Sequence, residues 1–128
     1  MENLKLDGTA KTPLISFASS GKLELKGRSI PENSVEFYQP VKAWIEDYSK
    51  NPSAQTVIDV KLDYFNTSSS KCILDLFKKL EKMNGNGTEV LVNWYFEENN
   101  EDMEEAGEDY QAIISLPFKM IEVEVGEA

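Results

Sequence analysis

The chain has 128 residues, of which 41% are hydrophobic and 28% charged, and its formal net charge is −10. This size and composition predict one globular domain over residues 1–128, with a core from about residue 10 to about residue 125. The acidic excess argues against binding to nucleic acids or anionic membranes, because both interactions need Lys and Arg.

The residue types that are missing narrow the function further. The chain has no histidine, which removes the commonest general base and metal ligand. No metal-ligand spacing or phosphate-cradling glycine loop is present, so we expect no metal and no cofactor. The one cysteine, Cys72, falls among apolar helix positions and is interpreted as a small buried hydrophobe. No apolar run approaches the length of a membrane span, and the start lacks signal-peptide features, so we expect a cytoplasmic protein.

The first half of the chain predicts a hairpin, a helix and a strand. Residues 13–25 alternate apolar and polar around a Ser20-Gly21 turn, which is typical of two antiparallel strands. Residues 35–50 carry apolar side chains at helical spacing, and Pro40 within them predicts either a kink or a helix that starts near it. Residues 56–65 alternate strictly and predict a strand.

The second half repeats the helix–strand alternation twice. A helical stripe begins at Ser69 and ends before the Gly85-Asn86-Gly87 sequence. Residues 89–96 are almost continuously apolar, which favours a central strand covered on both faces. A helix within residues 97–114 and a strand over residues 118–125 complete the chain. Trp44 and Trp94 fall on apolar faces and are expected in the core.

The predicted order of elements is therefore β-β-α-β-α-β-α-β. This alternation predicts a single-domain α/β fold whose sheet is mixed but mostly parallel, with the hairpin supplying the antiparallel part. The first ten or so residues and the last few are expected to be loose.

Residues 63–83 contain an unusual junction between a strand and a helix. One hydroxyl or amide side chain from Asn66, Thr67 and Ser68 is enough to cap the helix, yet three more hydroxyl positions and a lysine crowd the same turn. Free backbone amides and the positive end of a helix stabilise a phosphate group. We therefore predict that one hydroxyl of this turn is phosphorylated. The turn and its partner contacts comprise Asn66, Ser68, Ser69, Ser70 and Lys71.

Several long segments together resemble the SiaC family of bacterial regulatory phosphoproteins. They are TPLISF, GKLELKGRSIPEN, FYQPVKAWIEDY, LDYFNTSSSKCILDLFKKLE, VNWYFEENNEDMEEAGEDY and LPFKMIEV, and they occur in the family's order from Thr12 to Val123. The resemblance implies a fold like the STAS domains of anti-sigma-factor antagonists. It also places the phosphorylated threonine of the NTSSSK motif at Thr67, and we predict Thr67 as the modified residue with Ser68 as second choice. It also implies a partner switch with three partners: a serine/threonine kinase, a metal-dependent phosphatase and a target such as a diguanylate cyclase.

The acidic stretch from residue 97 to residue 109 is open to two interpretations. It is either a solvated helix face or a docking face for a basic partner, carried by Glu101, Asp102, Glu104 and Glu105. It lacks the residue order of a calcium-binding loop. A non-enzymatic signalling module is favoured for the whole chain, and the alternatives are a small enzyme that works through carboxylates and hydroxyls or a constitutive interaction domain.

Overall fold

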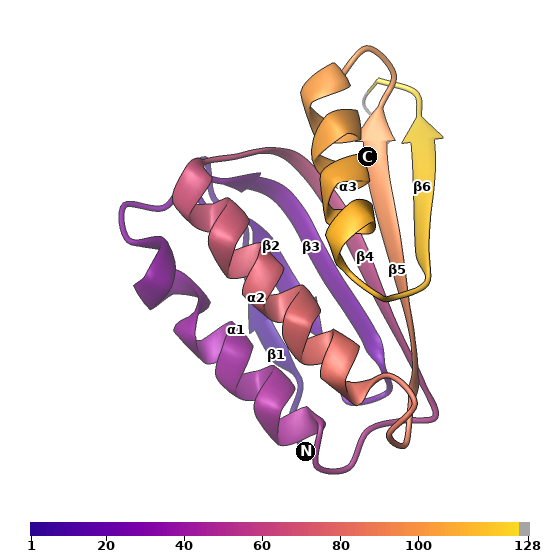
Figure 1. The fold of residues 1–128 in the computed structure, drawn as a ribbon. Helices are drawn as coiled ribbons and strands as arrows, with labels where there is room; N and C mark the ends of the chain where they lie inside the picture. The colour runs from indigo at the N-terminus through magenta and orange to yellow at the C-terminus, as the bar shows by residue number, and fades with distance from the viewer. Residues whose placement is uncertain (126–128) are drawn as a thin grey trace.

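Six strands and three helices follow one another in residues 1–125, which the computed structural model describes (Figure 1). The strands are β1 (Leu4–Leu6), β2 (Leu14–Phe17), β3 (Lys22–Ser29), β4 (Gln55–Phe65), β5 (Glu89–Glu97) and β6 (Phe118–Val123). The helices are α1 (Ser34–Tyr48), α2 (Thr67–Met83) and α3 (Glu101–Ile113). The predicted order is confirmed from the hairpin onward, and β1 was missed. The chain end that was expected to be loose lies partly at residues 126–128, outside the described residues.

All six strands form one sheet in the order β1-β2-β3-β4-β5-β6. The pairs β1–β2 and β2–β3 are antiparallel, and the pairs β3–β4, β4–β5 and β5–β6 are parallel. The sheet is therefore mixed as expected, but with two antiparallel pairs among its five, parallel pairing dominates less than predicted. The additional antiparallel pair comes from β1. The start of the chain was expected to be loose, but Leu4 and Leu6 pack against the core and β1 pairs with β2.

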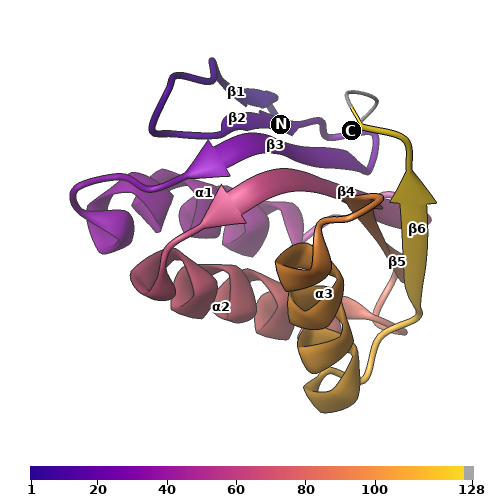
Figure 2. The ribbon, with the colours of Figure 1, turned by 90° about the horizontal axis from the view of Figure 1, so that it is seen from above.

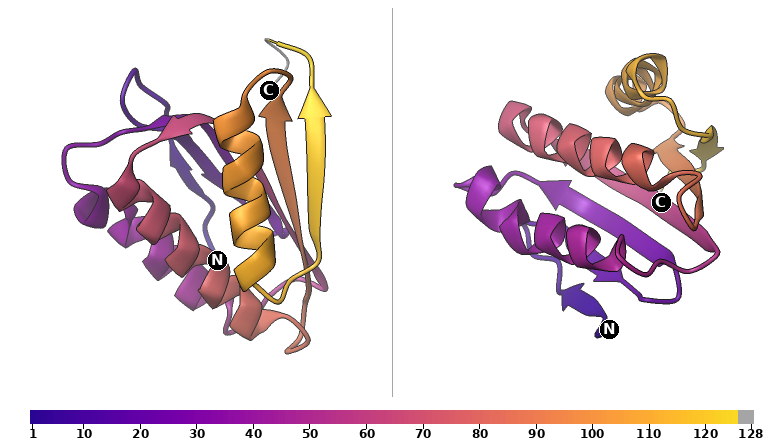
Figure 3. Two further views of the ribbon diagram at one scale, coloured as in Figure 1. Left: turned by 45° about the horizontal axis from the view of Figure 1, so that its top comes forward. Right: turned by 60° about the horizontal axis from the view of Figure 1, so that its bottom comes forward.

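The three helices lie on the same face of this sheet (Figure 2). Each helix connects a strand to its next neighbour in the same direction, and connections of the usual right-handed kind place all such helices on one side. Helices α1 and α2 lie side by side, whereas α3 covers β5 and β6 (Figure 3). The prediction that β5 is covered on both faces is wrong: Val90, Val92, Trp94 and Phe96 are buried, while the residues between them are half-exposed.

The core lies between the sheet and the three helices. Trp94 is completely buried and Trp44 nearly so, which confirms both predictions. Cys72 is also buried as expected, and this burial raises the pKa of its thiol. Around Trp94, the rings of Phe77 and Tyr110 form edge-on and tilted contacts that join α2 and α3 to β5.

An asparagine caps the start of each helix. The side-chain oxygens of Asn33, Asn66 and Asn100 accept hydrogen bonds from the backbone amides three residues later, at distances of 3.1, 2.8 and 3.2 Å. Helix α1 therefore begins before Pro40, which lies inside it, so a start near Pro40 is wrong. Because β3, β4 and β5 are parallel, all three helix N-termini lie along one edge of the sheet.

Candidate functional site

The turn between β4 and α2 lies at this edge, in the middle of the three helix N-termini. Asn66 is the cap, so the first of the three predicted capping candidates is the one used. Helix α2 consequently begins at Thr67, two residues earlier than the apolar stripe indicated. The turn is also tied to the neighbouring strand, because the Asn66 amide donates to the Ser29 carbonyl at 3.1 Å.

The four hydroxyl residues of the turn have different surroundings. Ser69 is completely buried, and Ser70 Oγ donates to the Thr67 carbonyl at 2.6 Å. Ser68 Oγ lies 3.0 Å from Ser34 Oγ and 3.3 Å from Asn66 Oδ1. Thr67 is exposed, and its hydroxyl forms no hydrogen bond with any of residues 1–125. Within the described structure, Thr67 is therefore the member of the turn whose hydroxyl is both accessible and uncommitted.

The buried side of the turn continues into residues that the sequence did not point to. Ser69 Oγ lies 2.8 Å from Ser29 Oγ and 3.2 Å from Ser34 Oγ. Ser29 Oγ in turn lies 2.7 Å from the hydroxyl of Tyr38, whose burial raises its pKa to about 12. These hydroxyls come from β3, α1 and α2, and no spacing within one segment could have grouped them.

The first turn of α2 differs in charge from those of the other helices. Helices α1 and α3 carry carboxylates there, whereas α2 has none. The backbone amides of Thr67 and Ser68 also have no acceptor among the described residues. Lys71, which is exposed and has no carboxylate within 4.0 Å in residues 1–125, lies four residues after Thr67 and so on the same helical face. The turn thus offers two amide donors, a positive helix end and one free cation to an added anion.

A groove between α2 and α3 opens beside this turn. Its volume is about 250 Å³, and its lining consists of Phe65, Ser70, Lys71, Leu74, Ala106, Asp109, Tyr110 and Ile113. The Tyr110 hydroxyl donates to the Ser70 carbonyl at 2.8 Å, which fixes α3 against the first turn of α2. Ile113 is 63% exposed at one side of the groove. At the sheet edge where the helix N-termini lie, two apolar residues are exposed, Val35 (64%) at the start of α1 and Tyr64 (50%) at the end of β4.

The predicted acidic residues all lie on α3. Glu101, Asp102, Glu104 and Glu105 are exposed. The start of α3 is held to β4 by the Asn100 side-chain amide, which donates to the Asp63 carbonyl at 3.3 Å. Burial, together with the charge of Glu97, raises the pKa of the Asp63 carboxyl. The carboxylate that lines the groove itself is Asp109, which the sequence did not single out.

The family model that matches this chain covers residues 6–123, and its description is SiaC family regulatory phosphoprotein. The chain belongs to the SiaC family. An uncharacterised protein of Pseudomonas aeruginosa strain UCBPP-PA14 is 34% identical over 119 residues, which are 92% of this chain and 94% of that protein.

Solved structures of SiaC proteins have the same fold. SiaC of P. aeruginosa matches with a TM-score of 0.88 and 31% identity, over 96% of this chain and 100% of the other. A crystal structure of the diguanylate cyclase SiaD in complex with its activator SiaC, also from P. aeruginosa, matches with a TM-score of 0.85 and 32% identity, over 94% and 99% of the two chains. The resemblance read from the sequence motifs is therefore confirmed for the family, and the chain has the fold of solved SiaC structures.

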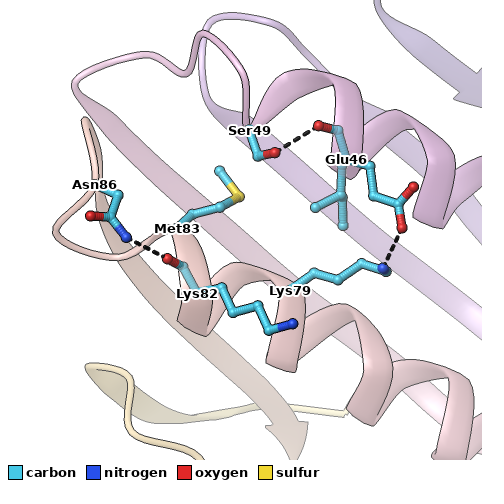
Figure 4. Close-up of a pocket in the computed structure, with 7 residues that line it drawn as sticks. Glu46, Ser49, Lys79, Lys82, Met83 and Asn86 are labelled. Carbon is cyan, nitrogen blue, oxygen red and sulfur yellow. Dashed lines mark hydrogen bonds and ion pairs between the residues drawn. The ribbon is translucent and has the colours of Figure 1, made fainter.

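This SiaC-family chain has a second hollow at the opposite end of α2 from Thr67, and Figure 4 shows the residues that line it. It has a volume of about 410 Å³ between the C-terminal ends of α1 and α2, and its lining includes Ile45, Met83 and the side chains of Lys79 and Lys82. Lys79 pairs with Glu46 and lowers the pKa of that carboxyl. Thr67 and Lys82 are fifteen positions apart in the same helix, a distance of roughly 22 Å, so charges at the two places are screened from each other.

Among residues 1–125, no group of three or more His, Cys, Asp or Glu side chains is arranged to hold a metal ion. No helix in that part of the chain is both long and apolar enough to cross a bilayer.

Proposed function

We propose that this chain is a non-catalytic partner-switch module controlled by reversible phosphorylation of Thr67. A cognate serine/threonine kinase adds the phosphate, a metal-dependent phosphatase removes it, and the unphosphorylated form binds and regulates a target in the cytoplasm. A diguanylate cyclase is the first candidate target, since SiaC of P. aeruginosa forms a complex with the cyclase SiaD as its activator. We also propose that the fold is related to STAS domains, and that residues 1–128 form a single domain with its core from about residue 10 to about residue 125.

The observation that carries the proposal is the free, exposed hydroxyl of Thr67 within a turn whose other hydroxyls are bonded or buried. A kinase needs a hydroxyl that it can reach without unfolding its substrate. Family membership supports the same assignment, because the family consists of regulatory phosphoproteins and the motif resemblance points to this threonine.

A phosphate at Thr67 changes the charge of the turn strongly and locally. It adds roughly −1.5 to −2 charges and three acceptor oxygens, which the free amides and Lys71 can bind. The modified state therefore needs no rearrangement of the sheet. A penalty of about 2.8 kcal/mol against a docked partner lowers its affinity about a hundredfold.

The target surface follows from the short range of this charge. Exposed charges act weakly beyond about 8–10 Å, so the target must contact the Thr67 turn or its immediate surroundings. The exposed Val35 and Tyr64 flank the turn, and the groove between α2 and α3 adjoins it. The acidic residues of α3 offer a second contact, Glu101, Asp102, Glu104 and Glu105, which steer a basic partner surface toward the site.

The first experiment is the intact mass of the chain after incubation with its cognate kinase and ATP, followed by peptide mapping. Addition of one phosphate at Thr67, with no turnover of small substrates by the chain, supports the module. Phosphate found solely outside residues 67–70 would refute it.

The second experiment measures binding before and after phosphorylation. SiaD of P. aeruginosa serves as the first probe, with the chain's own target to follow. Unmodified chain is expected to bind and phosphorylated chain to bind about a hundredfold more weakly. Equal affinity of both forms for the target would instead indicate a constitutive interaction domain.

A further inference from the structure

We propose that Ser34 of α1 restricts phosphorylation to Thr67, because it locks the hydroxyl of the neighbouring Ser68 into a directed chain of hydrogen bonds. The inference rests on the proposed phosphorylation of the turn and adds a positioning residue from another helix. Thr67 and Ser68 are adjacent and both exposed as residues, so exposure does not explain why one would be chosen over the other.

The chain of contacts runs from the core to the surface. It consists of Tyr38, Ser29, Ser69, Ser34, Ser68 and Asn66, with oxygen–oxygen distances of 2.7, 2.8, 3.2, 3.0 and 3.3 Å in that order. Ser29 and Ser69 are completely buried, and Ser34 is 3% exposed. Bulk water therefore cannot replace these partners at the inner end of the chain.

Which hydroxyl donates in each hydrogen bond of this chain follows from the contact at its surface end, between Ser68 and Asn66. The side-chain oxygen of Asn66 can accept but not donate, so Ser68 gives it its single hydrogen. Ser34 must then donate to Ser68, and because its own hydrogen is used, it accepts from Ser69. The same reasoning makes Ser29 the donor to Ser69, which is the direction that the geometry gives independently.

Tyr38 completes the chain at its buried end. Since the hydrogen of Ser29 goes to Ser69, Tyr38 must donate to Ser29, which it can do because its hydroxyl is protonated at neutral pH. Every hydroxyl hydrogen thus points toward Asn66, and aligned hydrogen bonds of this kind strengthen one another. The chain ends on the atom that also caps α2, since Asn66 Oδ1 accepts from the Ser69 amide.

This direction decides which hydroxyl can react. Phosphoryl transfer joins a hydroxyl oxygen to the γ-phosphorus of ATP, breaks the bond from that phosphorus to the β–γ bridging oxygen, releases ADP and passes the hydroxyl proton to the kinase. Ser68 gives its hydrogen to Asn66, so this bond must break before the proton can pass to the kinase, and the bond from Ser34 to the Ser68 oxygen holds the hydroxyl in that orientation. Thr67 lies outside the chain and must break none.

The first test needs no kinase. Proton coupling constants measured by NMR report the side-chain rotamer of Ser68. We expect one fixed rotamer in the wild-type chain and averaging among rotamers in Ser34→Ala. Tyr38→Phe is the matched control: it removes a hydroxyl from the same chain but leaves the contact between Ser34 and Ser68, so the Ser68 rotamer should stay fixed. A Ser68 side chain that already averages in the wild type overturns the inference.

The second test uses the cognate kinase and ATP in a Thr67→Ala background, where Ser68 is the nearest remaining hydroxyl. The rate of phosphorylation at Ser68 should rise about fivefold when Ser34→Ala is added, the factor that one hydrogen bond of ordinary net strength contributes. Adding Tyr38→Phe instead should leave that rate unchanged, since it removes a hydroxyl that bonds to Ser29 and leaves the contact between Ser34 and Ser68 in place.

Folding of each variant is checked by its thermal melt. If Ser34→Ala does not fold, Ser34→Cys replaces it, because a thiol keeps the shape but donates weakly. An unchanged Ser68 rate with Ser34→Ala, or an equal rise with Tyr38→Phe, overturns the inference. If the wild type carries no phosphate on the turn, the proposed function fails, while the rotamer measurement still decides whether Ser34 locks Ser68.

Discussion

Replacing Thr67 by alanine should leave the fold almost unchanged and fix the chain in its target-binding state. The Thr67 hydroxyl forms no hydrogen bond in residues 1–125, and the helix is capped by Asn66. Alanine at an exposed first position of a helix is at least as favourable as threonine. We therefore expect the free energy of unfolding to change by no more than about 0.5 kcal/mol.

Asn66→Ala is the matched comparison, because it should lower the free energy of unfolding at the same turn. It removes the bond to the Ser69 amide and also the acceptor of the Ser68 hydroxyl. Loss of a cap costs about 1 kcal/mol and at most about 2 kcal/mol. For a chain of this size, each 1 kcal/mol lowers the melting temperature by roughly 3–5 °C.

The assay combines urea unfolding with binding. Wild type, Thr67→Ala and Asn66→Ala are unfolded in urea, and their affinity for the target is measured with and without kinase and ATP. Thr67→Ala should bind equally well in both conditions, whereas the wild type should weaken about a hundredfold after treatment. If Thr67→Ala lowers the free energy of unfolding by more than about 1 kcal/mol, the Thr67 hydroxyl stabilises the fold. That result would refute the conclusion that this hydroxyl has no bonding partner.

Three further predictions concern α3 and the neighbouring strands. Gly107→Ala should lose about 1 kcal/mol in urea unfolding, because its Cβ would lie 2.5 Å from Trp94 Cδ1, and overpacking of about 2 kcal/mol exceeds the gain of about 1 kcal/mol in helix propensity. An equally stable variant would contradict this packing. Neutralising four acidic residues of α3 should slow target association at low salt and flatten its salt dependence, while Thr67→Asp weakens binding with little change in that slope; an unchanged on-rate would make the helix a solvated face. These four residues are Glu101, Asp102, Glu104 and Glu105. Asp63→Asn should raise the urea midpoint at neutral pH and do so less near about pH 4. The pKa of Asp63 is raised in the folded state above its ordinary 3.8, so ionisation costs stability as the pH rises through the folded-state pKa; a lower midpoint at neutral pH would refute this.

Local patterns along the chain were enough to predict most elements of the fold. The hairpin, the three helices and the later strands each follow from apolar periodicity and from turn residues such as Gly21 and Gly85, both of which have positive φ angles. β1 was missed because its three residues are too few to show a period. Its place depends on pairing with β2, and Leu4 is more than ten residues away from its partner Phe17.

The coverage of β5 could not be read from its sequence. A continuous apolar run is typical of a strand between two layers of helices. Here the strand order never reverses, so all helices fall on one face and Leu91 and Tyr95 lie half-exposed on the other. The order of strands in a sheet is a long-range property that no local pattern records.

The sequence by itself determined the position of the candidate site, since the strand-to-helix change and the hydroxyl-rich turn are both local features of residues 63–71. The motif resemblance added the choice of Thr67. Only the tertiary structure decided how the hydroxyls of that turn differ: it placed Ser34 of α1 against Ser68, and it brought Ser29 of β3 against Ser69. Contacts between residues more than thirty positions apart depend on how the strands and helices pack, so the commitment of each hydroxyl appears only once the chain is folded.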